Sequence, residues 1–273
     1  MRSIHPVPFR ILSCLGLLLA LPGCQEKADS TCDPCDSDQE LTGEAEAQLR
    51  LVLSARRSTD YAAPYGPDPI TVEDVEAIAW AAQGITLPDA PTNWPDVRGL
   101  RTAPSAGATY PLDLYVVAEK VTGLDPGAYH YVPADDALES TGVTGPLAAA
   151  VAQIRMDEYP ASEPKVFSEA AAIFVITDTF QRTSDKYGTW ADHYVAIEAG
   201  HVAQNILLMA TARGLAHRPW GAMGFDAREA LAELLNTSSD EEVEDATVPG
   251  CYQPWDTGSV HWPLYFIGVG QKP

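Results

Sequence analysis

Positive charge is scarce in this 273-residue sequence, which has 17 lysines and arginines against 38 aspartates and glutamates and a formal charge of −21. A nucleic-acid-binding surface needs clustered basic side chains, so we expect no nucleic-acid partner. The sequence also lacks internal repeats, a Gly-x-Gly-x-x-Gly loop for a nicotinamide nucleotide, and the Gly-x-Ser-x-Gly turn of a serine hydrolase. These absences argue against a repeat protein, a dinucleotide-binding loop and an α/β-hydrolase.

The N-terminal apolar run is short as well. It spans residues 11–21, whereas roughly 20 apolar residues are needed to cross a bilayer. The run follows Arg2 and Arg10 and ends in small residues, which predicts a signal peptide over residues 1–23. Residues 21–24, Leu-Pro-Gly-Cys, resemble the lipobox of bacterial lipoproteins, so we predict lipid attachment at Cys24; a plain secretory signal is the alternative. The expected location is the periplasm or cell surface, with membrane contact only through the lipid.

Cysteine is sparse, with five in the whole chain. If Cys14 is removed with the signal peptide and Cys24 carries lipid, then Cys32, Cys35 and Cys251 remain. Cys32 and Cys35 lie in a polar stretch, where a small disulfide is favoured because exported thiols tend to oxidise. A redox motif would need a neighbouring strand and helix, and a zinc site would need a second pair of ligands. We therefore predict no metal site.

The rest of the sequence predicts a lipidated flexible tether over residues 24–41 and one domain over residues 42–273, because large apolar residues are rare in the first segment and periodic in the second. The domain mixes helical and strand patterns, and its longest helix is expected to be the core helix. Thr71 and Asp74 have the spacing of a capping box at one helix start. Predicted helices cover about 42–57, 71–84, 146–156, 190–213 and 226–235, and predicted strands cover 112–118, 128–132, 171–177 and 264–269. The acidic run 240–245, within the long 240–262 insertion, reads as a solvated surface loop.

Four clusters of residues carry the chemistry. The first, residues 56–61, places Arg56, Arg57 and Ser58 at a helix end, where guanidinium and hydroxyl groups can donate to a phosphate ester, although a basic pair there also suits the helix dipole. The second, residues 101–111, is rich in small residues that let backbone approach a flat ring. The third is Glu-Ala-Gly-His-Val-Ala-Gln-Asn at 198–205. The fourth is His-Arg-Pro-Trp-Gly-Ala-Met-Gly-Phe at 217–225.

In this order and spacing, the four clusters resemble the nitroreductase superfamily of flavin enzymes, and most closely its SagB-type dehydrogenase branch. The resemblance covers about residues 50–270. It implies an α+β fold, with a mixed sheet wrapped by helices and a long central helix, and a homodimer that binds FMN at the subunit interface.

The resemblance also implies which residues hold FMN. Arg56 and Ser58, with Arg57 beside them and Lys272 near the C-terminus, correspond to phosphate contacts. Ring contacts correspond to Arg101, Pro104, Ser105, Ala106, Gly107, Gln204 and Asn205, and the backbone N–H of Gly221 or Ala222 corresponds to the donor to flavin N5. We expect the three turns that contain Arg56, Ser105 and Gly221 to line one cavity.

One position departs from the family pattern, which commonly has Arg or Lys where this chain has Asp60. A carboxylate there should make flavin reduction harder by roughly the few kcal/mol that close charges exchange. Either the register slips by one residue, Arg101 substitutes for the cation, or the flavin is unusual. Two further alternatives stay open, namely a carboxylate-bridged di-iron site at Glu198 and His201 and covalent FMN attachment at Thr109.

The expected activity is FMN-dependent transfer of hydride or electron pairs between the flavin and a small-molecule or peptide substrate outside the cytoplasm. No acid–base side chain is required, because the cofactor carries the chemistry and the protein orients it. The alternative is a non-catalytic lipoprotein that keeps the fold as a ligand-binding or structural module, which Asp60 and the long insertion favour.

Overall fold

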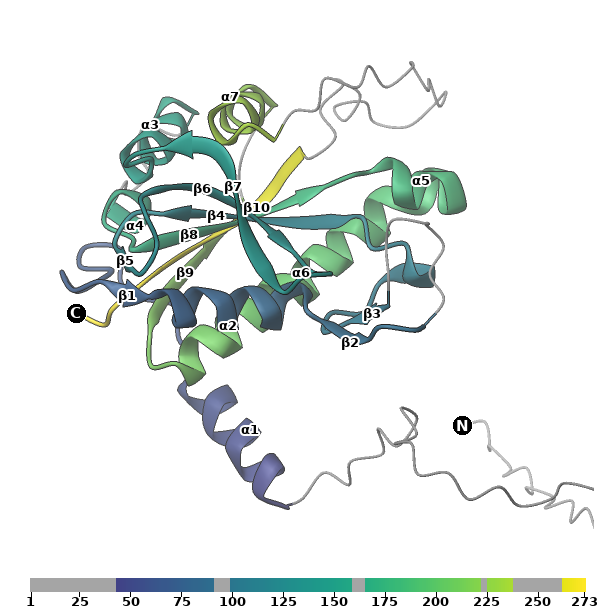
Figure 1. Cartoon of the computed structure of the whole chain (residues 1–273), viewed down its shortest axis with the longest axis horizontal. Helices are drawn as coiled ribbons and strands as arrows, with labels where there is room; N and C mark the ends of the chain where they lie inside the picture. The colour runs from purple at the N-terminus through teal and green to yellow at the C-terminus, as the bar shows by residue number, and fades with distance from the viewer. Residues whose placement is uncertain (1–42, 91–98, 159–164, 222–224, 238–261) are drawn as a thin grey trace, which may run out of the picture. The chain divides into compact units, whose positions relative to one another are not determined.

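A six-stranded sheet forms the centre of the fold in this computed structural model (Figure 1). The structure describes residues 43–90, 99–158, 165–221, 225–237 and 262–273. Strands follow the order β7-β6-β4-β8-β10-β9 across the sheet, and all five neighbouring pairs are antiparallel. The strands are β4 Leu112–Ala118, β6 Gly127–Val132, β7 Ala137–Thr144, β8 Ala172–Asp178, β9 Ala216–Trp220 and β10 Trp262–Gly270.

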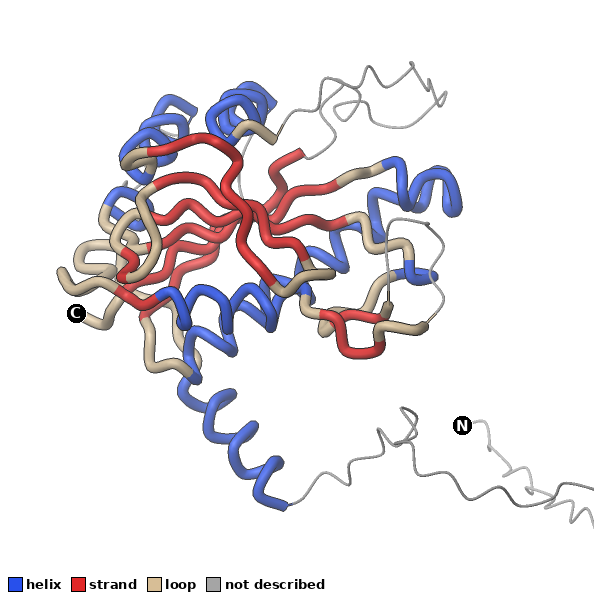
Figure 2. The backbone as a smooth tube through the Cα atoms, in the orientation of Figure 1, coloured by secondary structure: helices blue, strands red, loops and turns tan. Residues whose placement is uncertain are grey.

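Helices cover both faces of this sheet (Figure 2). One face packs against α2 Val72–Gln83 and α6 Ala191–Ala212, and the other against α3 Ala148–Glu158, α4 Lys165–Ser168 and α7 Phe225–Leu235. Two further helices are α1 Gly43–Ala55, which buries none of its side chains, and α5 Gln181–Tyr187, which precedes α6. Short 3-10 turns span Ala106–Ala108 and Gly188–Trp190.

Strand β8 shows why the core has two halves. All seven of its residues are buried, and successive side chains of a strand point to opposite faces. Phe174 and Ile176 therefore pack toward α2 and α6, whereas Ile173 and Val175 pack toward α3, α4 and α7. The continuous apolar run that predicted a strand buried on both faces is confirmed.

The expected α+β class and long helix are also confirmed. Both strand directions occur, although in different sheets: β1 Ile70–Thr71 pairs in parallel with β5 Val121–Thr122, and the six-stranded sheet is antiparallel. A third pair joins β2 Ile85–Leu87 to β3 Leu100–Arg101 in antiparallel fashion.

The predicted helix and strand positions are largely reproduced. The capping box at Thr71 is present, with the Thr71 hydroxyl accepting from the Asp74 N–H at 3.3 Å and the Asp74 carboxylate accepting from the Thr71 N–H at 3.1 Å. The sequence patterns missed α4, α5, β7 and β9, and also the short strands β1, β2, β3 and β5. Strand β9 contains Pro219, which a ladder tolerates because β9 is an edge strand with β10 as its neighbour.

Among the described residues, none of the helices combines the length and apolarity needed to cross a membrane. The predictions for the signal peptide, Cys24, the tether, Cys32, Cys35, Cys251 and the acidic insertion fall on residues 1–41 and 238–261, outside the described residues.

Candidate active site

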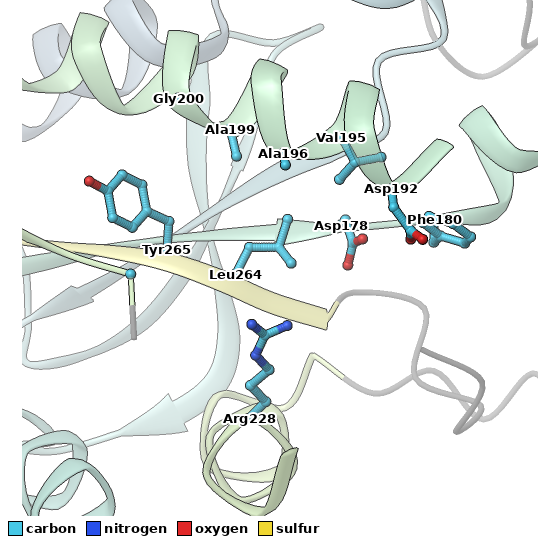
Figure 3. Close-up of a pocket in the computed structure, with 11 residues that line it drawn as sticks. Asp178, Phe180, Asp192, Val195, Ala196, Ala199, Gly200, Arg228, Leu264 and Tyr265 are labelled. Atoms are coloured by element: carbon cyan, nitrogen blue, oxygen red, sulfur yellow. The ribbon is translucent and has the colours of Figure 1, made fainter. Parts of the chain in front are cut away.

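A cavity of about 390 Å³ lies where strand β9 ends and β10 continues. Trp220, the last residue of β9, pairs with Phe266, so residues 262–265 of β10 extend past the end of β9. The pairing of β10 with β8 also shifts between Pro263 and Tyr265, which leaves Leu264 as an extra residue in the strand. Because β9 ends at Trp220, no strand covers residues 262–265 of β10 on that side, and the cavity lies there between α6 and α7 (Figure 3).

The walls of this cavity are mostly apolar, but three charged side chains enter it. They are Asp178 at the end of β8, Asp192 in the first turn of α6, and Arg228 from α7 (Figure 3). Asp178 is 2% exposed, and burial raises the pKa of its carboxyl to about 7 against the opposing charge of Arg228. Burial also raises the pKa of Asp192. The apolar walls are Phe180, Val195, Ala196, Ala199, Gly200, Leu264 and Tyr265.

Gly221 also lines the cavity, directly after β9. A Cβ atom at this position would meet the ring of Tyr265 at 3.0 Å. The bare backbone at Gly221 is therefore part of the fit between β9 and β10, and it is the expected donor position for flavin N5. Ala222, the other expected donor, lies outside the described residues.

A second polar group forms around His217 in β9. This side chain is 1% exposed, and burial lowers its pKa to about 4, with the positive charges of Arg56 and Lys272 adding to the shift. His217 is therefore neutral at pH 7, and its Nε2 lies 2.9 Å from the Thr211 hydroxyl. The structure places both Arg56 and Lys272 near His217 although 215 residues separate them in the sequence. In the described part of the chain, neither cation has a salt-bridge partner.

The loop after α1 is attached to β9. The Thr59 N–H donates to the His217 carbonyl at 3.0 Å, and the Arg218 guanidinium donates to the Thr59 carbonyl. Arg218 also lies 3.3 Å above the centre of the Tyr61 ring. These contacts hold the basic cluster of residues 56–61 against the edge strand.

The other residues of this loop face water. Arg57 is exposed and donates to the Ser54 carbonyl at 2.8 Å, which closes the C-terminal end of α1, and Ser58 is exposed. Asp60 is exposed too, and its Oδ1 accepts from the Ala62 N–H at 2.8 Å. The Asp60 carboxylate is thus hydrated and bound within its own turn, where water screens its charge.

A third polar group surrounds Arg101. Its guanidinium donates to Gln83 Oε1 at 2.8 Å and to the Leu112 carbonyl at 3.3 Å, and it lies 5.0 Å from the centre of the Tyr110 ring. Burial lowers the pKa of Arg101. These contacts link Arg101 to Gln83, Leu112 and Tyr110, so the protein itself orders the Arg101 side chain.

Glu198 of α6 faces the same group. It is 2% exposed, and burial raises the pKa of its carboxyl to about 7, while nearby Ser105 and Arg101 oppose the shift. Ser105 also accepts from the Tyr110 N–H at 2.8 Å. The Ser105 turn is therefore fixed against the middle of α6.

The small-residue turn itself is half-exposed to exposed, as a ring-binding surface requires. Pro104 and Gly107 are exposed, and Ala106 is intermediate. Gly107 has φ +58°, and a Cβ there would collide with Lys186 and Tyr187. Lys186 Nζ donates to the Gly107 carbonyl at 3.1 Å. Helix α5, which the sequence patterns missed, thus holds this turn.

Thr109, the alternative site for covalent FMN, is fully buried, and its hydroxyl lies 2.9 Å from that of Thr183. Its place in the core argues against that attachment.

On α6, Asn205 donates to the Thr102 carbonyl at 3.3 Å, and Gln204 is exposed. Glu198 is buried whereas His201 is exposed, and the described residues contain no group of three or more metal-ligating side chains.

That Arg56, Ser105 and Gly221 line one cavity stays a prediction. The cavity beside Gly221 is lined by neither Arg56 nor Ser105. Arg56 lies with His217 and Lys272 at the edge strand, and Ser105 lies with Glu198 at the middle of α6. The sequence order of the motifs carries no information on which copy of a chain supplies each of them to a shared site.

Comparison with known proteins identifies the fold and the class of activity. Residues 53–249 match the nitroreductase family. This chain belongs to the nitroreductase family. Its members are flavin-dependent oxidoreductases, which is the class of activity that membership assigns to this protein. A relative from Methanocaldococcus jannaschii, named as a nitroreductase, is 35% identical over 175 residues, which cover 62% of this chain and 76% of the relative.

Solved structures of this nitroreductase fold agree at low identity. A protein from Anabaena variabilis, named as a nitroreductase, has a TM-score of 0.60 and 18% identity; the match covers 85% of this chain but 39% of that one. One from Ralstonia eutropha, also named as a nitroreductase, has a TM-score of 0.56 and 20% identity, covering 82% and 83%. The E. coli microcin synthetase complex with truncated pro-MccB17 bound has a TM-score of 0.56 and 18% identity, covering 91% and 79%.

Sequence reasoning did not find Asp178, Asp192 or Arg228. Asp178 ends an apolar strand and Asp192 begins a helix, and both positions are ordinary places for an acidic residue. Only the early end of β9 reveals that the three side chains share a cavity.

Proposed function

We propose that this nitroreductase is an FMN-dependent oxidoreductase whose flavin site is built by two copies of the chain. One copy supplies Arg56, Ser58, Lys272 and the backbone at Gly221, and the other supplies the turn 104–107. The observation that carries the proposal is the pair of cations, Arg56 and Lys272, which both lie near a neutral His217 and have no salt-bridge partner among the described residues. Two such cations without partners suit a phosphate dianion.

The residues present fit FMN in other respects. Gly221 leaves the backbone open next to the apolar cavity, and the turn 104–107 offers small residues at the surface. When bound, FMN supplies the hydride chemistry at its N5 atom. The protein's part is to hold the phosphate at the basic cluster, to leave the N–H after β9 free to donate, and to exclude water from one side of the ring.

Exposed apolar side chains support assembly into a homodimer. On α1, Leu49, Leu51 and Leu53 are 54%, 62% and 49% exposed, and on α6 Ile197 is 43% exposed. Leu49 and Leu53 are four positions apart and so lie on one face of α1, and exposed apolar side chains grouped in this way favour an interface. A second copy that covers α1 and α6 would also bring its own turn 104–107 toward the first copy.

Mixed dimers test the two-chain site. Arg56→Ala and Ser105→Phe should each weaken FMN binding when present in both copies. A dimer assembled from one chain of each variant should regain one intact site, because the unmodified Arg56 of one copy faces the unmodified Ser105 of the other. FMN absorbance and fluorescence titrations measure the recovery, and circular dichroism checks folding. No recovery in purified mixed dimers would contradict the proposal.

Turnover is tested on the purified, FMN-loaded protein. We expect a yellow protein that bleaches with a two-electron reductant and recovers its colour with oxygen or a quinone. A dehydrogenase of the SagB type, acting on a reduced small molecule or peptide, suits a location where nicotinamide nucleotides are scarce. A colourless protein that does not bind added FMN would instead support the non-catalytic binding module.

The predicted export and lipid anchor belong to the same proposal. We infer that the protein works outside the cytoplasm, tethered through Cys24. Mass spectrometry of the mature N-terminus should find an acylated Cys24, and Cys24→Ser should release the protein from the membrane fraction. An N-terminus that retains residues 1–23 would refute this placement.

A further inference from the structure

The two carboxylates of the cavity share an unusual feature. Asp178 Oδ1 and Asp192 Oδ1 are both inaccessible to solvent and have no hydrogen-bond partner within the described residues. A buried acceptor without a donor is destabilising, most of all when it is charged. Both oxygens belong to residues that line the same cavity, and the two carboxylates are close enough to interact (Figure 3).

The charge of the cavity lining is unbalanced. Arg228 contributes one positive charge among the lining residues, whereas Asp178 and Asp192 contribute two negative charges when ionised. A metal ion is a poor candidate, because the described residues contain no group of three or more metal-ligating side chains. An organic cation needs only two acceptors, and its apolar part would contact Phe180, Val195 and Leu264.

We propose that this cavity binds an organic cation with N–H donors, such as a protonated amine or amidine, which donates to Asp178 and Asp192 while its apolar body extends toward Gly221. The volume of about 390 Å³ is within the range of small-molecule sites. A ligand held in this way ends beside the backbone that we expect to face the flavin. The role of the cavity as a substrate site therefore rests on the proposed function, but the cation site itself does not.

Protonation of the cavity should control this binding. The carboxyl of Asp178 faces Asp113 and Asp192, which raise its pKa, and Arg228, which lowers it, and Tyr265 also lines the cavity. Because Asp178 titrates at about pH 7, a cation should bind more tightly at pH 8 than at pH 6. Protons and the ligand compete for the same carboxylate.

The probe is benzamidinium, and its matched control is benzamide, which has nearly the same shape without the charge. Isothermal titration calorimetry at pH 8, with and without saturating FMN, should show benzamidinium bound at least tenfold more tightly than benzamide. Asp178→Asn and Asp192→Asn should each weaken benzamidinium at least tenfold. Glu229→Gln, which removes an exposed carboxylate from the same helix as Arg228, should leave the affinity unchanged.

Three outcomes would overturn the cation site. The first is equal affinity for benzamidinium and benzamide, and the second is unchanged benzamidinium affinity in both Asp variants. The third is a combined result, in which FMN loading abolishes benzamidinium binding and the two Asp variants change the affinity for FMN. The last would assign the cavity to the flavin. A protein that binds benzamidinium but never FMN would refute the proposed function and leave the cation site standing. The two probes are compared on the wild-type chain, so the test survives a variant that fails to fold.

Discussion

At the scale of single residues, burial shifts the pKa values of the Asp178 and His217 side chains. Both are nearly inaccessible to solvent, at 2% and 1% exposure. Burial disfavours the charged form of each, so the pKa of the acid rises to about 7 and the pKa of the base falls to about 4. At neutral pH the histidine adds no positive charge near Arg56 and Lys272, whereas the Asp178 carboxyl can still take up a proton.

Asp178 makes the stability of the protein depend on pH. Its pKa in the folded protein is about 7, above the unfolded value of roughly 3.9, so the folded state binds more protons between these pH values and stability falls as the pH rises through them. Asp178→Asn removes this cost. We expect the variant to be more stable than wild type at pH 8 by on the order of a few kcal/mol, and the difference to shrink toward pH 4.

Urea unfolding at both pH values measures this effect, with the exposed Asp68→Asn as control. Parallel pH profiles for wild type and Asp178→Asn would show that burial does not shift the Asp178 carboxyl.

Arg56 and Arg57 are neighbours with different environments. Arg56 is half-buried beside Lys272 and His217, whereas Arg57 is exposed and bonded to the Ser54 carbonyl. Arg56→Ala should therefore weaken FMN binding by about tenfold or more, the effect of losing one charge-assisted hydrogen bond. Arg57→Ala should change it by much less. Fluorescence quenching of FMN measures both affinities, and an equal loss in the two variants would place the phosphate elsewhere.

At the scale of elements, the short edge strand β9 decides where a ligand can enter. Five residues of β9 pair with the C-terminal half of β10, and the N-terminal half of β10 therefore borders the cavity. Pro219 and the Gly221 that follows suit an edge strand that ends early. Helix α5 has a similar positioning role, because Lys186 holds the Gly107 turn.

Helix α2 has the clearest local start signal, and its cap can be tested alone. The Thr71 hydroxyl accepts from the Asp74 N–H, and Asp74 Oδ1 also accepts from Arg213 Nε at 2.7 Å at the end of α6. Thr71→Ala should lower the free energy of unfolding by about 1 kcal/mol, as the loss of an N-cap commonly does. Thr71→Ser keeps the hydroxyl and should lose much less. Chemical denaturation gives both values, and equal losses would mean that the methyl group matters instead of the cap.

At the scale of the whole molecule, the exposed apolar side chains and the separation of Arg56 from Ser105 both support the proposed flavin site built by two chains. Ile197 lies on the face of α6 that remains uncovered in one chain. Ile197→Glu should shift the protein from the proposed dimer to a monomer and weaken FMN binding at the same time, because the proposed interface would bury a charge. The same charge at exposed Thr144, at the end of β7, should change neither property.

Analytical ultracentrifugation and FMN titration on the same samples measure these two effects. A monomeric Ile197→Glu variant with unchanged FMN affinity would separate assembly from cofactor binding and argue for a site within one chain.

The sequence by itself determined the elements whose signals are local. The capping box at Thr71, the apolar run of β8 and the length of α6 each depend on residues close together in the chain, and the nitroreductase motifs identified the family from their order. Strand β9 was missed because its five residues are stabilised by pairing with β10, about 50 positions later, and contain a proline that reads as a loop.

Only the tertiary structure decided how the site residues are grouped. Arg56 and Lys272 both come near His217 because the loop after α1 binds β9 and the chain end follows β10. Asp178, Asp192 and Arg228 meet because three different elements border the gap left by β9. Contacts of this kind join residues far apart in the sequence, so no periodicity or spacing records them, and their energies depend on burial that exists only once the chain has folded.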